Sequence, residues 1–151
     1  MAYFQMDKNP IKDLKTEEDY RLWSKGCYRQ ADEFYRVAYR CRDMLLSGES
    51  NAVYTNISFA CELYLKSLLF AQNIDCRREH NLFKLYKNLP EKMQEQLKGL
   101  HPCGNIPKEN FELELKELGK SFTVFRYIYE RSTIAWNAQF LLELLDTLHK
   151  L

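Results

Sequence analysis

The hydrophobic pattern of the chain is helical, and its most apolar stretch runs from Ile57 to Phe70. On a helical wheel this stretch is apolar almost all the way round, which is typical of a helix surrounded by other helices. Glu62 and Lys66 interrupt it, four residues apart and in the favoured acid-first order. We expect residues 52–72 to form a central helix whose charged pair is either a slot to solvent or a partly buried polar site.

Three other segments place apolar residues at alternating steps of three and four, which is the seam of a bundle helix. The predicted helices begin at the capping residue Thr16, at Pro107 and near Trp136, and the last continues to the C-terminus. The first ends at a short turn over 47–50, so it should lie antiparallel to the central helix. The second should run unbroken to Tyr129. Two shorter helices are predicted over 82–89 and 90–100.

The composition fits one helical domain over 16–151, preceded by a loose arm over 1–15. The 151 residues include only five glycines and four prolines, which favours helices over a sandwich or barrel. The net charge of +1 neither demands nor excludes a nucleic-acid partner. Five cysteines, three within apolar helical patterns, predict free thiols in a reducing cytosol. No apolar run reaches the roughly 18–20 residues that span a bilayer, so we expect a cytoplasmic protein without a membrane partner.

A basic stripe follows the outer face of the first predicted helix. Its candidate RNA contacts are Arg29, Arg36 and Arg40, and three tyrosines are interleaved nearby, Tyr28, Tyr35 and Tyr39. Arginines bind phosphates and aromatic rings stack on bases, so this face is a candidate nucleic-acid surface. The alternative is an ordinary solvated face, which acidic residues in the same stripe favour.

A second polar cluster lies near the end of the helix predicted over 107–129. Arg126 and Glu130 border its apolar stripe in the weaker base-first order, which leaves them free to pair elsewhere. We expect a half-buried ionic network in which Arg126 meets Glu62 and Glu130 meets Lys66, since unpaired charge inside a bundle is costly. The functional alternative is a phosphate or RNA pocket lined by these four residues and Tyr127.

Two cysteines and two histidines fall in predicted loops and supply enough donors for tetrahedral zinc. They are Cys76, His80, His101 and Cys103. The second pair is separated by a single residue, which is outside the usual zinc-finger spacings. No glycine-rich phosphate loop or dinucleotide-binding fingerprint is present in the sequence. We therefore expect neither a metal nor a cofactor.

Three motifs, taken in order, resemble the HEPN (higher eukaryotes and prokaryotes nucleotide-binding) domain family. They are Phe-Ala-Cys-Glu-Leu-Tyr-Leu-Lys-Ser-Leu-Leu at 59–69, His-Asn-Leu at 80–82, and Phe-Arg-Tyr-Ile-Tyr-Glu at 125–130. The resemblance covers roughly residues 20–150. It implies an all-α, up-and-down bundle of four long helices with one or two short ones, commonly homodimeric. Members include metal-independent ribonucleases of toxin, antiphage and RNA-processing systems, and non-catalytic RNA- or nucleotide-binding versions, some partnered with a small nucleotidyltransferase.

The chain departs from the catalytic members of that family at one motif. They carry an Arg about four to six residues before a His, which together supply charge stabilisation and proton transfer. Here Arg77 and Arg78 lie too close to His80, and no other histidine has the pair. We therefore expect a non-catalytic RNA- or nucleotide-binding module, homodimeric, in a defence or toxin–antitoxin setting. The alternatives are a divergent metal-independent ribonuclease that uses Arg126, Glu130 and His80, or a structural bundle that binds another protein through one of its faces. A nucleotidyltransferase or a defence protein is a candidate partner.

Overall fold

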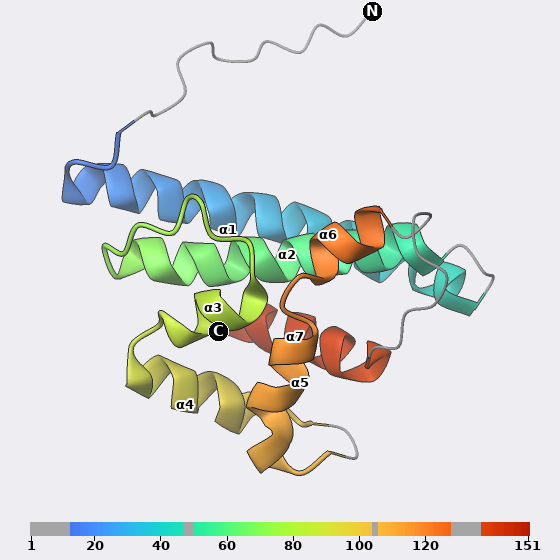
Figure 1. The fold of residues 1–151 in the computed structure, drawn as a ribbon. Coiled ribbons are helices and arrows are strands. Elements are labelled where there is room, and N and C mark those ends of the chain that lie inside the picture. The colour runs from blue at the N-terminus through green and yellow to red at the C-terminus, as the bar shows by residue number, and fades with distance from the viewer. Residues whose placement is uncertain (1–12, 47–49, 104–105, 128–136) are drawn as a thin grey trace, which may run out of the picture.

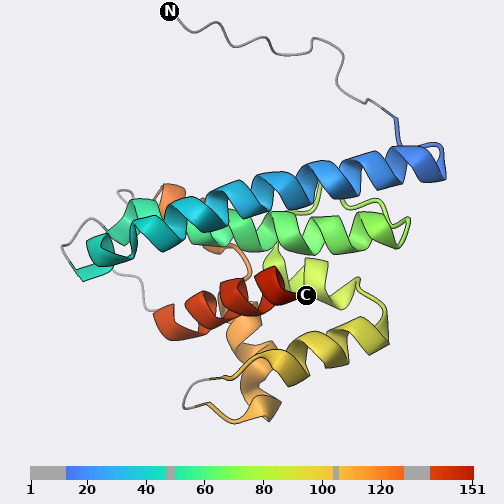
Figure 2. The same cartoon turned by 180° about the vertical axis from the view of Figure 1, so that it is seen from behind.

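A computed structural model describes residues 13–46, 50–103, 106–127 and 137–151, and within these ranges the chain is all-α. The long helices α1 (Glu17–Arg40) and α2 (Ser50–Ala71) lie side by side (Figures 1 and 2). The remaining elements are η1 (Arg42–Leu46), α3 (Leu82–Lys87), α4 (Glu91–Leu100), η2 (Lys108–Asn110), α5 (Phe111–Glu117), α6 (Ser121–Arg126) and α7 (Ala138–Lys150). The predicted fold class is confirmed.

Helix α1 begins where the sequence predicts. The Thr16 hydroxyl accepts the backbone N–H of Asp19, and the Asp19 carboxylate accepts the N–H of Thr16, which is a complete capping box. Its apolar face packs against α2 in antiparallel register, because Trp23 contacts Phe70 at one end and Phe34 contacts Phe59 further along.

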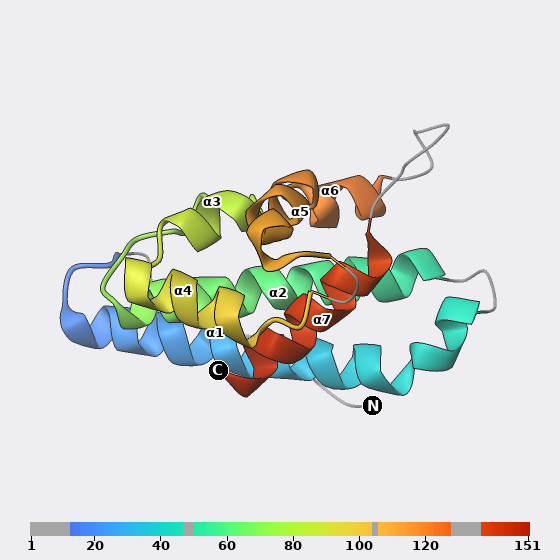
Figure 3. The ribbon, with the colours of Figure 1, turned by 90° about the horizontal axis from the view of Figure 1, so that it is seen from below.

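Helix α2 is the centre of the molecule, as its apolar pattern indicates. It is in contact with α1, α3, α6 and α7 (Figure 3). Side chains on all its faces are buried, among them Ile57, Leu65 and Leu69. Burying one such side chain contributes about 1.5–3 kcal/mol, so this helix supplies much of the driving force for folding.

The helix predicted from Pro107 to Tyr129 is not continuous within its described part. It is divided into η2, α5 and α6, and the chain changes direction at Leu118–Lys120 (Figure 1). At the bend the carbonyl of Gly119 accepts the backbone N–H of Leu82, and Gly119 lies against the side chain of Asn81. A Cβ atom there would come within 2.7 Å of the Asn81 side chain, so any residue other than glycine would force that side chain to shift. Residues 128–136 lie outside the described part.

Helices α3, α4, α5 and α7 form a second layer on the side of α2 away from α1 (Figures 1 and 2). Aromatic rings join this layer: Phe111 of α5 contacts Tyr86, Phe140 and His101. Asn137 caps α7 by accepting the N–H of Phe140. Within the described residues, no helix combines the length and the apolar character needed to cross a membrane.

Candidate functional site

The charged pair of α2 is buried. Glu62 is 1% exposed and Lys66 is 7% exposed, and the Lys66 ammonium lies 3.0 Å from Glu62 Oε1. Successive turns of α2 place them on one face, and the loop after α2 covers that face. The expected buried polar site is therefore present, but its members pair first with each other.

His80 is the second partner of Glu62. Its Nδ1 lies 2.8 Å from Glu62 Oε1, the same oxygen that Lys66 contacts. A carboxylate only accepts hydrogen bonds, so His80 donates through Nδ1–H. Its side chain is 61% exposed, and its Nε2 has no hydrogen-bond partner in the described part of the chain. The imidazole is thus oriented by a buried carboxylate while its other nitrogen stays free.

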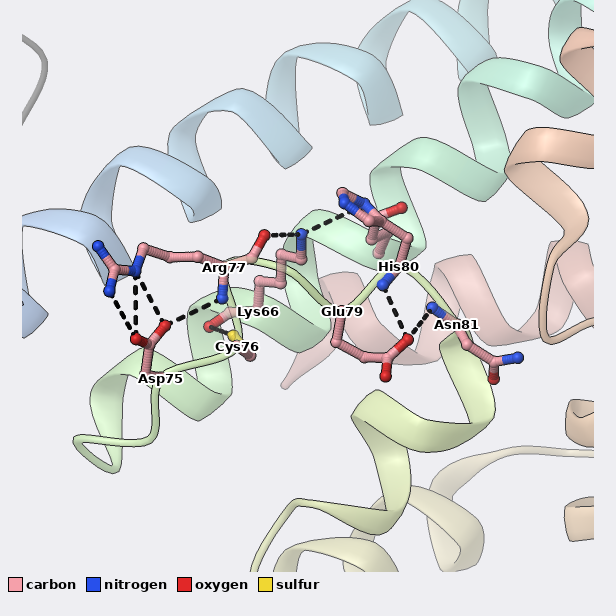
Figure 4. A network of polar contacts seen from close by, with 8 residues as sticks. Lys66, Asp75, Cys76, Arg77, Glu79, His80 and Asn81 are labelled. Atoms are coloured by element: carbon pink, nitrogen blue, oxygen red, sulfur yellow. Dashed lines mark hydrogen bonds and ion pairs between the residues drawn. The ribbon is translucent and has the colours of Figure 1, made fainter. Parts of the chain in front are cut away.

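The loop over 75–81 is tied to α2 by backbone and side-chain contacts (Figure 4). The Lys66 ammonium donates to the carbonyl of Arg77 at 3.3 Å, and the Cys76 thiol lies 3.9 Å from the carbonyl of Lys66. Asp75 binds the Arg77 guanidinium through both carboxylate oxygens, and this contact lowers the pKa of Asp75. The loop that carries His80 is therefore attached to α2 through both the side chain and the carbonyl of Lys66.

Glu79 and Asn81 organise the chain on either side of His80 (Figure 4). Glu79 accepts the backbone N–H groups of His80 and Asn81 at 2.9 and 2.8 Å. Burial acts to raise the pKa of Glu79, but these two donors and nearby cations outweigh it and leave the pKa lowered. Asn81 caps α3 by accepting the N–H of Lys84. The histidine thus lies at a rigid junction between loop and helix.

The predicted network between Glu62 and Arg126 is wrong. Phe122 stacks on Phe59 and Phe125 contacts Tyr54, so α6 runs antiparallel to α2 and carries Arg126 towards the start of α2. Arg126 is exposed and lies over the ring of Tyr127, and in the described residues it makes no ion pair with Glu62. Glu130, the other expected partner, lies outside the described residues. Arg126 therefore lies beside the first turns of α2, away from Glu62 and Lys66 further along the helix.

The zinc alternative has no geometric support in the described residues, where no group of three or more His, Cys, Asp or Glu side chains could hold a metal ion. His101 is buried, with its Nδ1 accepting the N–H of Cys103 and its Nε2 donating to the carbonyl of Phe140. His80 instead pairs with Glu62. All five cysteines are free, and burial raises the pKa of the Cys76 thiol to about 12, which opposes formation of a metal-binding thiolate.

The three candidate RNA-contact arginines lie on the exposed face of α1. Arg29 lies 3.7 Å from Glu33 and Arg36 lies 2.6 Å from Asp32, both on the same helix. Arg40 has no ion pair among the described residues. The acidic neighbours noted in the sequence therefore take up two of the three arginines, through contacts that stay largely exposed on the arginine side.

An open pocket of about 430 Å³ lies beside the loop over 75–81. Asp75 and Glu79 line it together with Arg77 and Arg78. The charges of these four side chains balance, so the pocket has no net charge that would attract an anion.

Two features were not predicted from the sequence. The contact between Glu62 and His80 joins residues 18 positions apart, and no local spacing rule signals it. His149, near the end of α7, stacks on Tyr35 of α1 with ring centroids 3.8 Å apart. In the sequence, the only indication of this contact was that His149 is an aromatic residue in the last turn of a predicted helix.

A scan against protein-family models matches the HEPN domain over residues 24–150. Neither a comparison with curated proteins nor one with solved structures gave a match. The matched range contains the buried pair of α2, the loop with His80 and the arginine face of α1. Because the match covers nearly the whole chain, the chain belongs to the HEPN domain family.

Proposed function

We propose that this protein is a non-catalytic RNA- or nucleotide-binding HEPN module that works as a homodimer in a defence or toxin–antitoxin system. Membership of the family supports a role connected with RNA or nucleotides. The absence from the sequence of the Arg-His motif of catalytic members supports the non-catalytic part.

The observation that carries the proposal is the row of arginines on α1. From Arg29 to Arg40 it extends about 16 Å along the helix axis. The Arg29 side chain is 86% exposed, and its partner Glu33 is also exposed, so their ion pair contributes little to stability. A phosphate can therefore take the place of the carboxylate at small cost, and release of counterions from the nucleic acid favours the exchange.

The alternative is a divergent metal-independent ribonuclease, and one observation favours it. Glu62 orients the ring of His80 through Nδ1 and leaves Nε2 available, as a histidine in proton transfer requires. Arg126 does not support it, because that residue lies towards the other end of α2.

An RNA-binding experiment tests the proposal. We expect a labelled 20-nucleotide RNA to bind at low salt, and the triple substitution of Arg29, Arg36 and Arg40 by Gln to weaken binding tenfold or more. Three lost phosphate contacts should reduce the slope of log K against log salt by about 2. Affinity measured by fluorescence anisotropy at several salt concentrations provides both quantities.

A matched control removes the same charge elsewhere. Lys92, Lys116 and Lys120 are exposed residues of α4, α5 and the start of α6, and their substitution by Gln should leave the salt slope unchanged. An equal loss in both variants would reduce the effect to net charge and contradict the proposal. No binding to RNA or to a nucleoside triphosphate would favour a protein-binding bundle. Cleavage of the RNA in EDTA, abolished by His80→Gln, would favour the ribonuclease.

A further inference from the structure

Each of the three arginines on the exposed face of α1 directly follows a tyrosine. The pairs are Tyr28-Arg29, Tyr35-Arg36 and Tyr39-Arg40. Consecutive residues of an α-helix are separated by about 100° around the axis, so a stripe of rings runs beside the stripe of guanidinium groups. Tyr28 and Tyr39 are among the most exposed large hydrophobic residues of the described chain.

Two of these rings belong to a continuous series of stacked groups, which we term the ring ladder: His149, Tyr35, Tyr39 and Arg42. The rings of His149 and Tyr35 are nearly parallel, at 10° and 3.8 Å between centroids. Tyr35 and Tyr39 are stacked at 26° and 6.4 Å. The Arg42 guanidinium lies 5.2 Å from the centre of the Tyr39 ring. The ladder leads from the end of α7 to the surface of α1.

The inner end of the ladder is held rigidly. His149 Nδ1 lies 2.8 Å from the hydroxyl of Tyr64 on α2, and the end of α7 reaches α1 at this point (Figure 3). Towards the outer end Tyr39 is 60% exposed, although the Arg42 guanidinium lies over its ring. A preformed aromatic surface is a favourable binding site because little side-chain entropy is lost when a flat ligand stacks on it.

Carboxylates flank the ladder and define its charge. Asp32 lies 2.6 Å from Arg36 and 3.5 Å from His149, and Asp146 lies 3.4 Å from Arg42. The Arg36 side chain nevertheless remains 69% exposed, so it keeps surface available for a phosphate. The site therefore combines an exposed ring with arginine side chains that keep much of their surface exposed.

We propose that the ligand of this face is single-stranded RNA, with unpaired bases stacked on Tyr39 and Tyr28 and with phosphates on the adjacent arginines. This inference rests on the proposed RNA-binding function and specifies the class of RNA. In a duplex the faces of the bases are covered by their neighbours, whereas an unpaired base presents its face to an aromatic side chain. Arginines alone would bind either form through its phosphates.

The test compares three probes: a 12-nucleotide RNA, the same RNA annealed to its complement, and inorganic polyphosphate as a ligand without bases. We expect Tyr39→Leu to weaken binding of the single strand roughly tenfold, because one stacked base is lost. Tyr39→Phe keeps the ring and should retain the affinity. Neither variant should change binding of polyphosphate.

Each outcome bears on one of the two proposals. Equal affinity for single strand and duplex, or no effect of Tyr39→Leu on the single strand, would overturn the stacking proposal and leave RNA binding by the arginines intact. Failure of every probe to bind at low salt would overturn the RNA-binding function on which this inference rests. Thermal unfolding confirms that the variants are folded, and if Tyr39→Leu does not fold, Tyr28→Leu takes its place in the same comparison.

Discussion

At the scale of single residues, the central feature is one carboxylate oxygen that accepts hydrogen bonds from two side chains. Glu62 Oε1 contacts both the Lys66 ammonium and His80 Nδ1. The other oxygen, Oε2, is buried and has no hydrogen-bond partner in the described residues. A buried charge is tolerated only while its partner is present, so each member of the pair depends on the other.

We therefore predict that Glu62→Gln lowers the free energy of unfolding by about 3 kcal/mol, because Lys66 is left buried without a counter-charge. Lys66→Met should have a similar effect for the converse reason. The double variant should lose clearly less than the sum of the two, since it removes both buried charges together. Urea unfolding of the four proteins measures this coupling.

The control is an exposed pair with the same spacing of four residues. Arg29 and Glu33 on α1 are both exposed, so the corresponding double-mutant cycle should give a coupling below about 0.5 kcal/mol. If the buried pair shows no larger coupling than this, the two charges are not mutually dependent.

At the scale of secondary-structure elements, the bend at Leu118–Lys120 connects α5 and α6 to the loop that carries His80. The N–H of Leu82 donates to the carbonyl of Gly119, and Asn81, which lies against Gly119, caps α3. The bend therefore packs directly against the start of α3, at the two residues that follow His80 in the chain.

We predict that Gly119→Ala lowers the free energy of unfolding by about 1–2 kcal/mol. The new methyl group would come within 2.7 Å of the Asn81 side chain, so the cap of α3 must shift, and loss of a cap costs about 1 kcal/mol. Chemical unfolding monitored by circular dichroism measures the change.

Gly26 provides the matched substitution, because a Cβ atom there meets nothing within 4 Å. It lies inside α1, where alanine is favoured over glycine, so Gly26→Ala should raise the free energy of unfolding by about 0.5–1 kcal/mol. The same sign for both substitutions would show that the contact with Asn81 does not constrain the bend.

At the scale of the whole molecule, His101 connects parts of the second layer. It ends α4, donates to the carbonyl of Phe140 on α7, and packs against Phe111 of α5. Burial lowers its pKa below the usual value of 6.5. The folded protein thus holds this histidine neutral, and global stability is linked to its protonation.

The direction of the pH dependence follows from the lowered pKa. Below pH 6.5 the unfolded chain takes up a proton at His101 more readily than the folded protein does. We predict that His101 contributes fully to stability above pH 6.5, and that this contribution declines as the pH falls below that value, by at most about 1.4 kcal/mol per pH unit.

Urea unfolding between pH 5 and 7.5 measures this dependence, with His101→Asn as the comparison. That variant is expected to be less stable throughout and to show a smaller slope against pH, since the titrating ring is gone. Identical slopes in the two proteins would assign the dependence to other groups.

The sequence alone determined the start of α1 and the buried faces of α1, α2 and α7. Thr16 and Asp19 specify the start of α1 through contacts within four residues, and the apolar pattern of 57–70 specifies a surrounded helix. The steps of three and four along α1 and α7 likewise identify their core faces. These features depend on neighbours along one helix, so local physics is sufficient to predict them.

The tertiary structure decided which distant residues meet. The sequence placed Glu62 and Lys66 in a polar gap but assigned Arg126 as a partner, whereas the loop after α2 brings His80 there instead. It also predicted one helix across Gly119, because the close approach of Asn81 leaves no trace in a periodic pattern.

The candidate RNA face shows the same division. The arginines and tyrosines of α1 are readable from the sequence, but the ring ladder depends on His149, which follows Tyr35 by more than a hundred residues. Such a contact is formed only when α7 packs against α1 and α2. Spacing along a helix determines which side chains share a face, and packing between helices determines what those side chains touch.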